Sequence, residues 1–262
     1  MQRTAGTLGK ESWRLVFKAA AGLQAVVLAI YLKWGGVTLA NEYIDDEPGP
    51  KAARETASQL LRRVSRDGAF WSMALAKMCL LGVGQQIGFI PLYLVTGLGF
   101  DAGAASVVSG LFAVGSLFSS LMGAKVYKSL SPQHQVSVIA GMNVCNTVLP
   151  AVLALNAVKA IPSLSHAVVL TILTLWGCSW ALPFYIPPGI VALKIGGRDH
   201  AALITNLYDA FGFGLAALYS IAAMEYGRVG NWAPIMVLLS VFGGLSTISM
   251  HYAMKKDMKK KK

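Results

Sequence analysis

The sequence predicts an all-α integral membrane protein with about seven transmembrane helices, on the basis of composition and charge distribution. Of the 262 residues, 55% are hydrophobic and only 13% are charged, and the mean hydropathy is +0.55. Water-soluble domains carry about 25% charged residues, so this composition excludes most soluble classes. The charged residues also gather between long apolar stretches, which is typical of spans joined by loops. Three cysteines are too few for a disulfide scaffold.

Apolar segments reach or approach the roughly 20 residues that a helix needs to cross a bilayer. They cover residues 15–32, 70–95, 104–124, 136–155, 167–193, 201–224 and 232–254. The first segment is the weakest, because Lys18 and Gln24 interrupt it. As an alternative, residues 19–32 resemble the apolar core of a signal peptide, with Thr38-Leu39-Ala40 as a small-residue cleavage site.

The basic residues predict the orientation of the spans. If residues 33–69 are cytoplasmic, the loops on that side hold most of the basic residues, as the positive-inside rule requires. The inside positions are Lys33, Lys51, Arg54, Arg62, Arg63, Arg66, Lys125, Lys128, Lys194, Arg198 and the tail lysines. The outer loops between the later spans hold only Lys159 and Arg228. This pattern predicts a multi-pass protein with a cytoplasmic C-terminus, and it leaves the identity of the membrane open.

The chain divides into four parts. Residues 1–40 form an N-terminal flank and span, 41–69 a cytoplasmic loop, 70–254 a six-helix bundle and 255–262 a basic tail. Within the loop, apolar residues recur every three or four positions, which favours an amphipathic helix over 51–66, although a solvated linker is the alternative. Short connections predict that consecutive bundle helices are antiparallel neighbours. The small residues Gly84/Gly88 and Gly115/Ser119/Gly123 predict close helix packing.

Several stretches resemble the major facilitator superfamily. Residues 98–105 (LGFDAGAA), 110–117 (GLFAVGSL) and 123–128 (GAKVYK) resemble its helices seven and eight and the loop that follows. The opening SWRLVF at 12–17 resembles the start of its helix six. The resemblance covers nearly the whole chain and implies helix six followed by the C-terminal six-helix half. A full member has twelve spans, so the chain would be a fragment or a truncated form. The basic residues before position 19 would then lie in an outer loop.

Within the superfamily, the sugar-phosphate and glycerol-phosphate exchangers are the most similar. The likeness lies in Ala76-Lys77-Met78, in PLYL at 91–94 and in residues 201–217. It implies an antiporter that exchanges an organophosphate for phosphate. The sequence departs from that pattern at Tyr127-Lys128, where the loop motif usually carries an acid. It also lacks the helix-seven arginine that grips phosphate in the bacterial exchangers, and has glutamines there instead.

Two opposite charges lie at the same depth within the predicted spans. Asp209 is eight residues from Ala201, or about 12 Å along a helix, and Lys77 is seven residues from Phe70, or about 10 Å. Isolated charges are costly at this depth and commonly mark ion or substrate paths. We therefore expect Lys77 and Asp209 to face one cavity and to pair. The alternative is a permanent structural strut, with Lys77 reaching toward the interface.

The remaining candidates are polar, aromatic or helix-breaking residues of the same spans. The predicted substrate-binding residues are Lys77, Gln85, Gln86, Asp209, Tyr208 and Trp180. The predicted hinge consists of Pro183, Pro187, Pro188 and Gly189, since broken helices line cavities in transporters. Gln85, Gln86 and Trp180 have packing as an alternative role. Asn143 and Asn146 are interpreted as packing residues.

Other functions find little support in the sequence. Two glycine patterns, at 82–88 and 212–217, imitate dinucleotide fingerprints but lie within spans rather than after a strand. No metal, cofactor or catalytic group is predicted, and the net charge of +11 is explained by loops and tail rather than by nucleic-acid binding. The sequence therefore predicts no enzyme. It favours a secondary transporter, or half of one, for a small polar or anionic metabolite. Its partners would be the lipid bilayer and either the missing N-terminal half or another subunit. The alternative is a non-transporting membrane scaffold.

Overall fold

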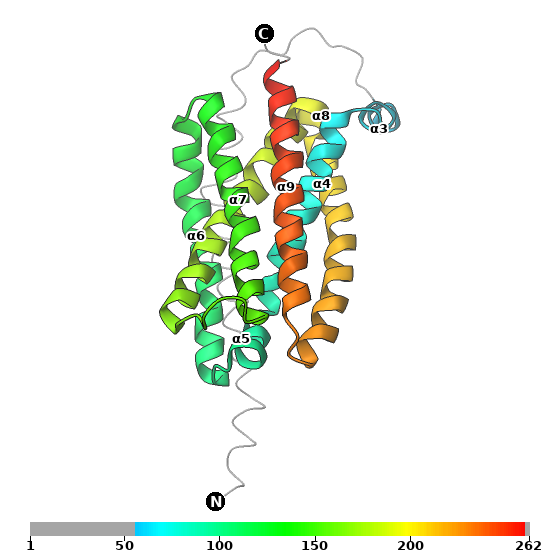
Figure 1. Ribbon diagram of the computed structural model, residues 1–262. Coiled ribbons are helices and arrows are strands. Elements are labelled where there is room, and N and C mark those ends of the chain that lie inside the picture. Colours follow the sequence, from blue (N-terminus) through cyan, green and yellow to red (C-terminus); the bar gives the residue numbers. More distant parts are fainter. Residues whose placement is uncertain (1–55, 260–262) are drawn as a thin grey trace, which may run out of the picture. The chain divides into compact units, whose positions relative to one another are not determined.

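The computed structural model describes residues 56–259, which are 89% helical and contain no strand. Figure 1 shows the long helices running roughly along one common axis, with the short helix α3 lying across one end. In chain order they are α3 (Ala57–Val64), α4 (Gly68–Gln85), the 3-10 helix η2 (Gln86–Gly88), α5 (Ile90–Leu98), α6 (Ala102–Ser129), α7 (Pro132–Ala157), α8 (His166–Arg228) and α9 (Ala233–Lys259).

Four of the described helices, α6 to α9, are long and apolar enough to cross a membrane. The helices on either side of η2 pass the same test together, but they are bent by 64°. The predicted span 70–95 is therefore a broken one. Pro91 lies in the first turn of α5, where its missing N–H costs no helical hydrogen bond. The proline also disfavours helical backbone angles in the residue that precedes it. The count of seven spans stays a prediction, because 15–32 lies outside the described residues.

Helix α8 consists of two arms. Its 63 residues would measure about 95 Å if straight, three times the roughly 30 Å of a hydrocarbon core. Gly197 interrupts it with φ 64° and ψ −171°, and Figure 1 shows the helix turning back there. We call residues 166–196 arm A and residues 198–228 arm B. The predicted spans 167–193 and 201–224 lie one in each arm.

The predicted break at Pro183, Pro187, Pro188 and Gly189 is wrong, whereas the predicted role of these residues as a hinge stays a prediction. The backbone stays helical through all four positions, and Gly197 is the residue of α8 with non-helical angles. A proline inside a helix removes one hydrogen bond, which neighbouring helices in a membrane can replace. The prolines therefore leave acceptors free within arm A, and the change of direction falls on a glycine.

Substituting Gly197 with alanine is expected to lower the free energy of unfolding by about 1–3 kcal/mol, because its backbone angles are in a region that only glycine adopts readily. The matched control is Gly189→Ala. Gly189 is exposed and has helical backbone angles, and no atom lies within 4 Å of the place that a Cβ would occupy. Thermal unfolding in detergent compares the two variants. Equal stability of both would contradict the role of Gly197 as the turning point of α8.

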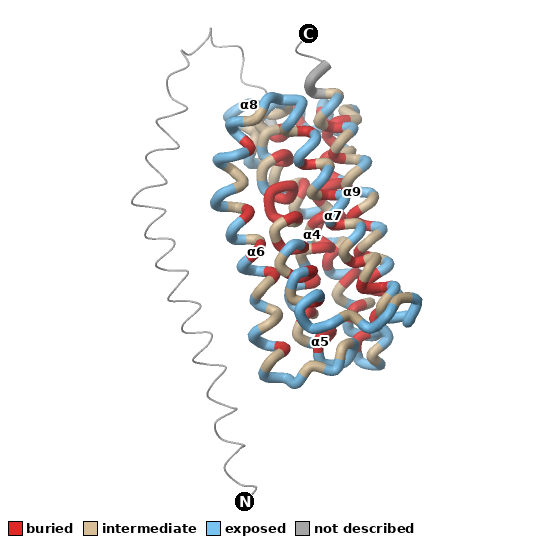
Figure 2. Tube along the Cα trace, turned by 60° about the vertical axis from the view of Figure 1, so that its left-hand side comes forward, coloured by how far each residue is buried: buried red, intermediate tan, exposed pale blue. Residues whose placement is uncertain are grey.

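The helices pack in an order that differs from their order in the chain. The main contacts join α4 to α8 and α9, α6 to α8, and α7 to α9. The prediction that consecutive helices are neighbours is therefore wrong for α6 and α7, which pack mainly on other helices. Of the most apolar 18 residues of α6, only 17% are buried, against 56% for the corresponding stretch of α8. Figure 2 shows α6 as a largely exposed helix at the edge of the bundle.

Helix α3 lies against one end of the bundle. The Thr56 hydroxyl and the Gln59 side chain cap its N-terminus reciprocally, and Leu60 and Val64 are buried among residues of α4 and α8. The Arg63 guanidinium donates to the Ile195 carbonyl at 2.9 Å, which ties α3 to the end of arm A. The predicted amphipathic helix is thus present from Ala57, and residues 51–55 lie outside the described part.

Candidate functional site

The candidate site is centred on the Lys77 ammonium in α4. Its side chain is 6% exposed, and Nζ lies 3.4 Å from Asp209 Oδ1 of arm B. Nζ also donates a hydrogen bond to the Phe184 carbonyl of arm A at 3.0 Å. The Phe184 ring centroid is 3.3 Å from Nζ, within cation–π range. A carboxylate, a carbonyl and a ring face thus replace the water that an ammonium normally binds.

The Phe184 carbonyl is available because of Pro188. In a helix, the carbonyl of residue 184 would accept from the N–H of residue 188, and proline has none. Lys77 supplies the missing donor from α4. Pro183 has the same effect one turn earlier, since it leaves the Ser179 carbonyl free, and Asn146 Nδ2 donates to it at 3.1 Å. The prolines predicted as a hinge therefore create the acceptors that connect arm A to α4 and α7.

Asp209 lies at the border between the core and an exposed face. Its side chain is 33% exposed, against 6% for Lys77. The prediction that the two residues pair is confirmed by their contact. The asymmetry in burial means that a solute can reach the carboxylate more readily than the ammonium.

Aromatic residues of arm A surround the pair. The Trp180 ring stacks on Phe184 with centroids 4.7 Å apart, and its Nε1 donates to the Leu80 carbonyl at 2.6 Å. A Cβ on Gly84 would overlap the Trp180 ring, so the close approach of arm A to α4 requires glycine there. Trp180 is therefore fixed in position beside Phe184, and Phe184 in turn contacts Lys77.

Sequence reasoning missed Phe184 and Tyr185. The Tyr185 ring centroid is 5.8 Å from Lys77 Nζ, and the residue is 58% exposed, so it lies on the open side of the site. The signal that could have identified Phe184 is Pro188 four residues later, because such a proline always frees a carbonyl. Nothing in the sequence alone indicated which charge would use it.

The two glutamines have different environments. Gln85 is exposed, whereas Gln86 is fully buried and accepts a hydrogen bond from the Tyr219 hydroxyl. Among the described residues, Gln86 Nε2 has no hydrogen-bond partner. Gln86 thus connects η2 to arm B, away from the charged pair. The structure does not bring Gln86 into contact with Lys77 or Asp209.

Tyr208 is also separate from the pair. It is fully buried, and its ring lies 5.3 Å from that of Phe70, on a different face of arm B from Asp209. Its hydroxyl has no hydrogen-bond partner within residues 56–259.

Asn143 and Asn146 belong to α7, and both are buried where α7 packs against neighbouring helices. Asn146 accepts from Ser179 Oγ at 3.2 Å, in agreement with a packing role.

Comparison of the chain with known protein families, curated proteins and solved structures finds no match. Within the described residues, no three His, Cys, Asp or Glu side chains are arranged to hold a metal ion. Residues 56–259 thus form a helical bundle that has four or five candidate membrane spans and a charged pair inside it.

Proposed function

We propose that this chain is the C-terminal part of a secondary transporter of the major facilitator type, which moves a small polar or anionic metabolite by alternating access. The observation that carries the proposal is the ion pair between Lys77 and Asp209, held between helices that are apolar enough to span a membrane. Charges are rare at such positions and are mostly functional. The bundle end that carries α3 and the Gly197 break would face the cytoplasm, because it collects the basic loops.

The arrangement supports a binding role for the pair. An anionic substrate that approaches Asp209 from its exposed side would compete with the carboxylate for the Lys77 ammonium. Tyr185 and Gln85 lie exposed on the same two elements, arm A and α4, and they offer neutral hydrogen-bonding groups. An organophosphate exchanged for phosphate fits this chemistry, and the likeness of residues 76–78 and 201–217 to the exchangers supports it.

Replacing Asp209 with asparagine is expected to reduce transport to the level of empty liposomes, while the protein still folds. Asparagine keeps an oxygen that can accept from Lys77, but it removes the negative charge that the ammonium needs when substrate leaves. The assay is uptake of radiolabelled inorganic phosphate into proteoliposomes loaded with glycerol phosphate. The matched control is Glu225→Gln, which neutralises an exposed carboxylate of the same arm.

The outcomes separate the two roles of the pair. Full uptake by Asp209→Asn would contradict a role in transport. Loss of folded protein, measured by size-exclusion chromatography, would show that the pair is a structural strut.

A second candidate function is that of a non-transporting membrane subunit. It is favoured by the exposure of Asp209, Tyr185 and Gln85 on the described bundle, since a site between them needs a second surface to enclose it. Absence of uptake by the unmodified chain, together with co-purification of one membrane partner, would favour this function over the first.

A further inference from the structure

A groove along the outer side of α9 is separate from the charged pair. Its volume is about 700 Å³, and it is lined by Ala140, Thr247, Ile248, His251, Tyr252, Lys255 and Lys256. All of these residues except Ala140, which lies on α7, belong to the last turns of α9. The volume lies within the roughly 300–1,000 Å³ typical of sites for small molecules. From its lining and its position at the end of a helix long and apolar enough to span a membrane, we infer that this groove binds an anionic phospholipid.

The groove changes from apolar to basic along α9. Ile248 is 70% exposed and Tyr252 54% exposed, and both lie in the last three turns of the apolar stretch that ends at Lys256. Apolar residues at that depth face hydrocarbon, whereas tyrosine and lysine at the end of a span lie at headgroup level. A ligand in this groove therefore has an apolar part beside Ile248 and a polar part beside Lys255. A phospholipid has this division, and a soluble anion lacks the apolar part.

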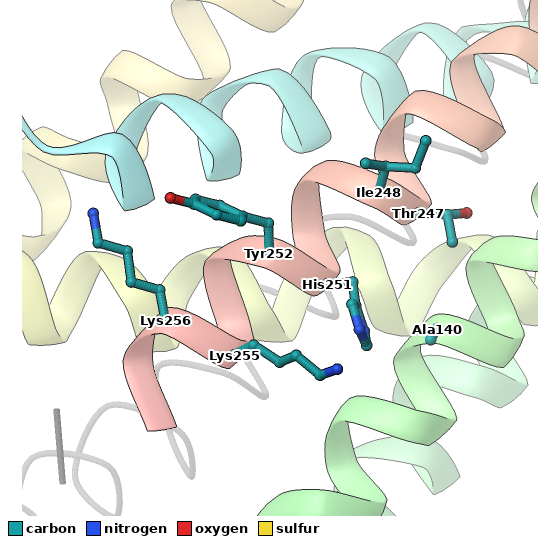
Figure 3. A pocket seen from close by; sticks show the side chains of 7 residues that line it. All are labelled: Ala140, Thr247, Ile248, His251, Tyr252, Lys255 and Lys256. Atoms are coloured by element: carbon teal, nitrogen blue, oxygen red, sulfur yellow. The ribbon is translucent and has the colours of Figure 1, made fainter. Parts of the chain in front are cut away.

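The charge at the polar end selects an anionic headgroup. Lys256 is engaged, since its Nζ lies 3.3 Å from Asp67 Oδ1. Lys255 is exposed and makes no ion pair with any described residue. Figure 3 shows the side chains of His251 and Lys255 directed toward the α7 side of α9, where Ala140 lies. The buried His251 Nδ1 has no hydrogen-bond partner in the described part of the chain. One cationic donor and one unpartnered imidazole nitrogen thus lie together on the side of the groove that faces α7.

The position of the groove in the bundle agrees with this ligand. Figure 1 shows the end of α9 at the same end of the bundle as the turn between α6 and α7 and the break in α8. Lys125, Lys128, Lys194 and Arg198 lie close in sequence to those two connections, and further lysines follow Lys256 in the sequence. A leaflet rich in anionic lipid is attracted to such an end, whereas a single bound lipid responds most to the lysine beside its headgroup. The inference is independent of the proposed transport function.

The test measures which lipid the full-length protein retains. Purified protein is incubated in detergent with equal amounts of phosphatidylglycerol and phosphatidylcholine of the same acyl chains, and bound lipid is counted by native mass spectrometry. We expect preferential retention of phosphatidylglycerol and a loss of about five-fold in that retention for Lys255→Gln. The matched control is Lys128→Gln, an exposed lysine at the same end of the bundle but outside the groove, which should retain the lipid.

Other results would overturn the inference. Two such results are equal retention of the two lipids and an unchanged preference for phosphatidylglycerol in Lys255→Gln. A third is displacement of phosphatidylglycerol by millimolar glycerol phosphate, which would indicate a site for a free anion. A photo-crosslinker in place of Ile248 identifies the occupant directly. Cross-links to lipid support the inference, whereas cross-links to residues 1–55 or to a second copy of the chain would show that protein covers the groove.

Discussion

Replacing Asp209 with leucine is expected to lower the free energy of unfolding by about 3–5 kcal/mol, the typical cost of leaving a buried charge without its partner. The Lys77 ammonium would keep only the Phe184 carbonyl and ring, and its side chain is 6% exposed. Lys77→Met should cost less, about 1–3 kcal/mol, which is the cost of an unsatisfied buried acceptor. The Phe184 carbonyl then has no donor, but Asp209, which is 33% exposed, can reach water or polar groups.

The double variant Lys77→Met/Asp209→Leu should be markedly more stable than Asp209→Leu alone. Replacing both members of a buried ion pair with apolar side chains is often close to neutral. We expect the remaining loss to match that of Lys77→Met, because the Phe184 carbonyl still lacks a donor. All three variants should lose phosphate uptake. The double variant would therefore be a folded but inactive protein, which separates the role of the pair in transport from its role in stability.

Chemical unfolding of the three variants in detergent measures these differences. The exposed pair of Arg228 and Glu225, 3.9 Å apart and about two-thirds exposed, provides the control. Replacing both of its members should change the stability by less than about 1 kcal/mol, as is typical of surface ion pairs. If Lys77→Met proved as damaging as Asp209→Leu, or the double variant were the least stable, the asymmetry in burial would have no energetic consequence.

The second large effect is expected at the contact between α6 and arm A. Gly177→Ala should destabilise the bundle by at least about 1–3 kcal/mol, the usual cost of overpacking. A Cβ at Gly177 would overlap the backbone of Phe112, and a Cβ at Gly115 would overlap the backbone of Thr174. Backbone atoms of two packed helices cannot move aside as a flexible side chain can, so the helices would have to separate.

Gly110→Ala is the matched control for Gly177→Ala. Gly110 lies in α6, the helix that packs against Gly177, and an added Cβ there would meet no atom within 4 Å. Because alanine favours helix more than glycine does, this variant should be neutral or more stable by up to about 1 kcal/mol. Thermal unfolding in detergent compares the two. A tolerated Gly177→Ala would mean that α6 is held to arm A by other contacts, such as the hydrogen bond from Ser116 Oγ to the Gly177 carbonyl at 3.2 Å.

Close packing of α6 was predictable in part. The four-residue spacing of Gly115, Ser119 and Gly123 indicated a helix face that another helix could approach closely. Gly177 on the partner helix lies in an apolar run without such a pattern. The sequence thus indicated which face of α6 would pack, whereas the helix that packs on it became evident only from the structure.

The charged pair was predictable to a similar degree. Equal depth in the membrane follows from helix rise, so Lys77 and Asp209 could be matched without knowledge of the fold. Their unequal burial could not be predicted, because it depends on which side of α4 and of arm B each residue occupies. The third partner, the Phe184 carbonyl, depends on Pro188 and on the approach of arm A to α4.

The amino-acid sequence alone was enough to predict the local structure of residues 56–259: their helical character, the approximate limits of the long apolar helices and the positions of the charges along them. These features follow from composition, hydropathy and the fixed geometry of the helix, which are local properties. The turn between the two arms lies at Gly197, between the predicted spans 167–193 and 201–224, whereas the additional break predicted at the prolines is absent. Both kinds of residue interrupt helices, and neighbouring helices can satisfy the acceptors that a proline frees.

Which helices are neighbours became evident only from the folded bundle. Short links join α6 to α7, yet α6 packs on α8 and α7 packs on α9. The choice of partner depends on the summed fit of side chains between helices far apart in the chain, and hydropathy carries no information about that fit. For the same reason the groove beside α9 was not predicted, since its walls come from α7 and α9, which lie about 100 residues apart in the sequence and meet only in the folded bundle.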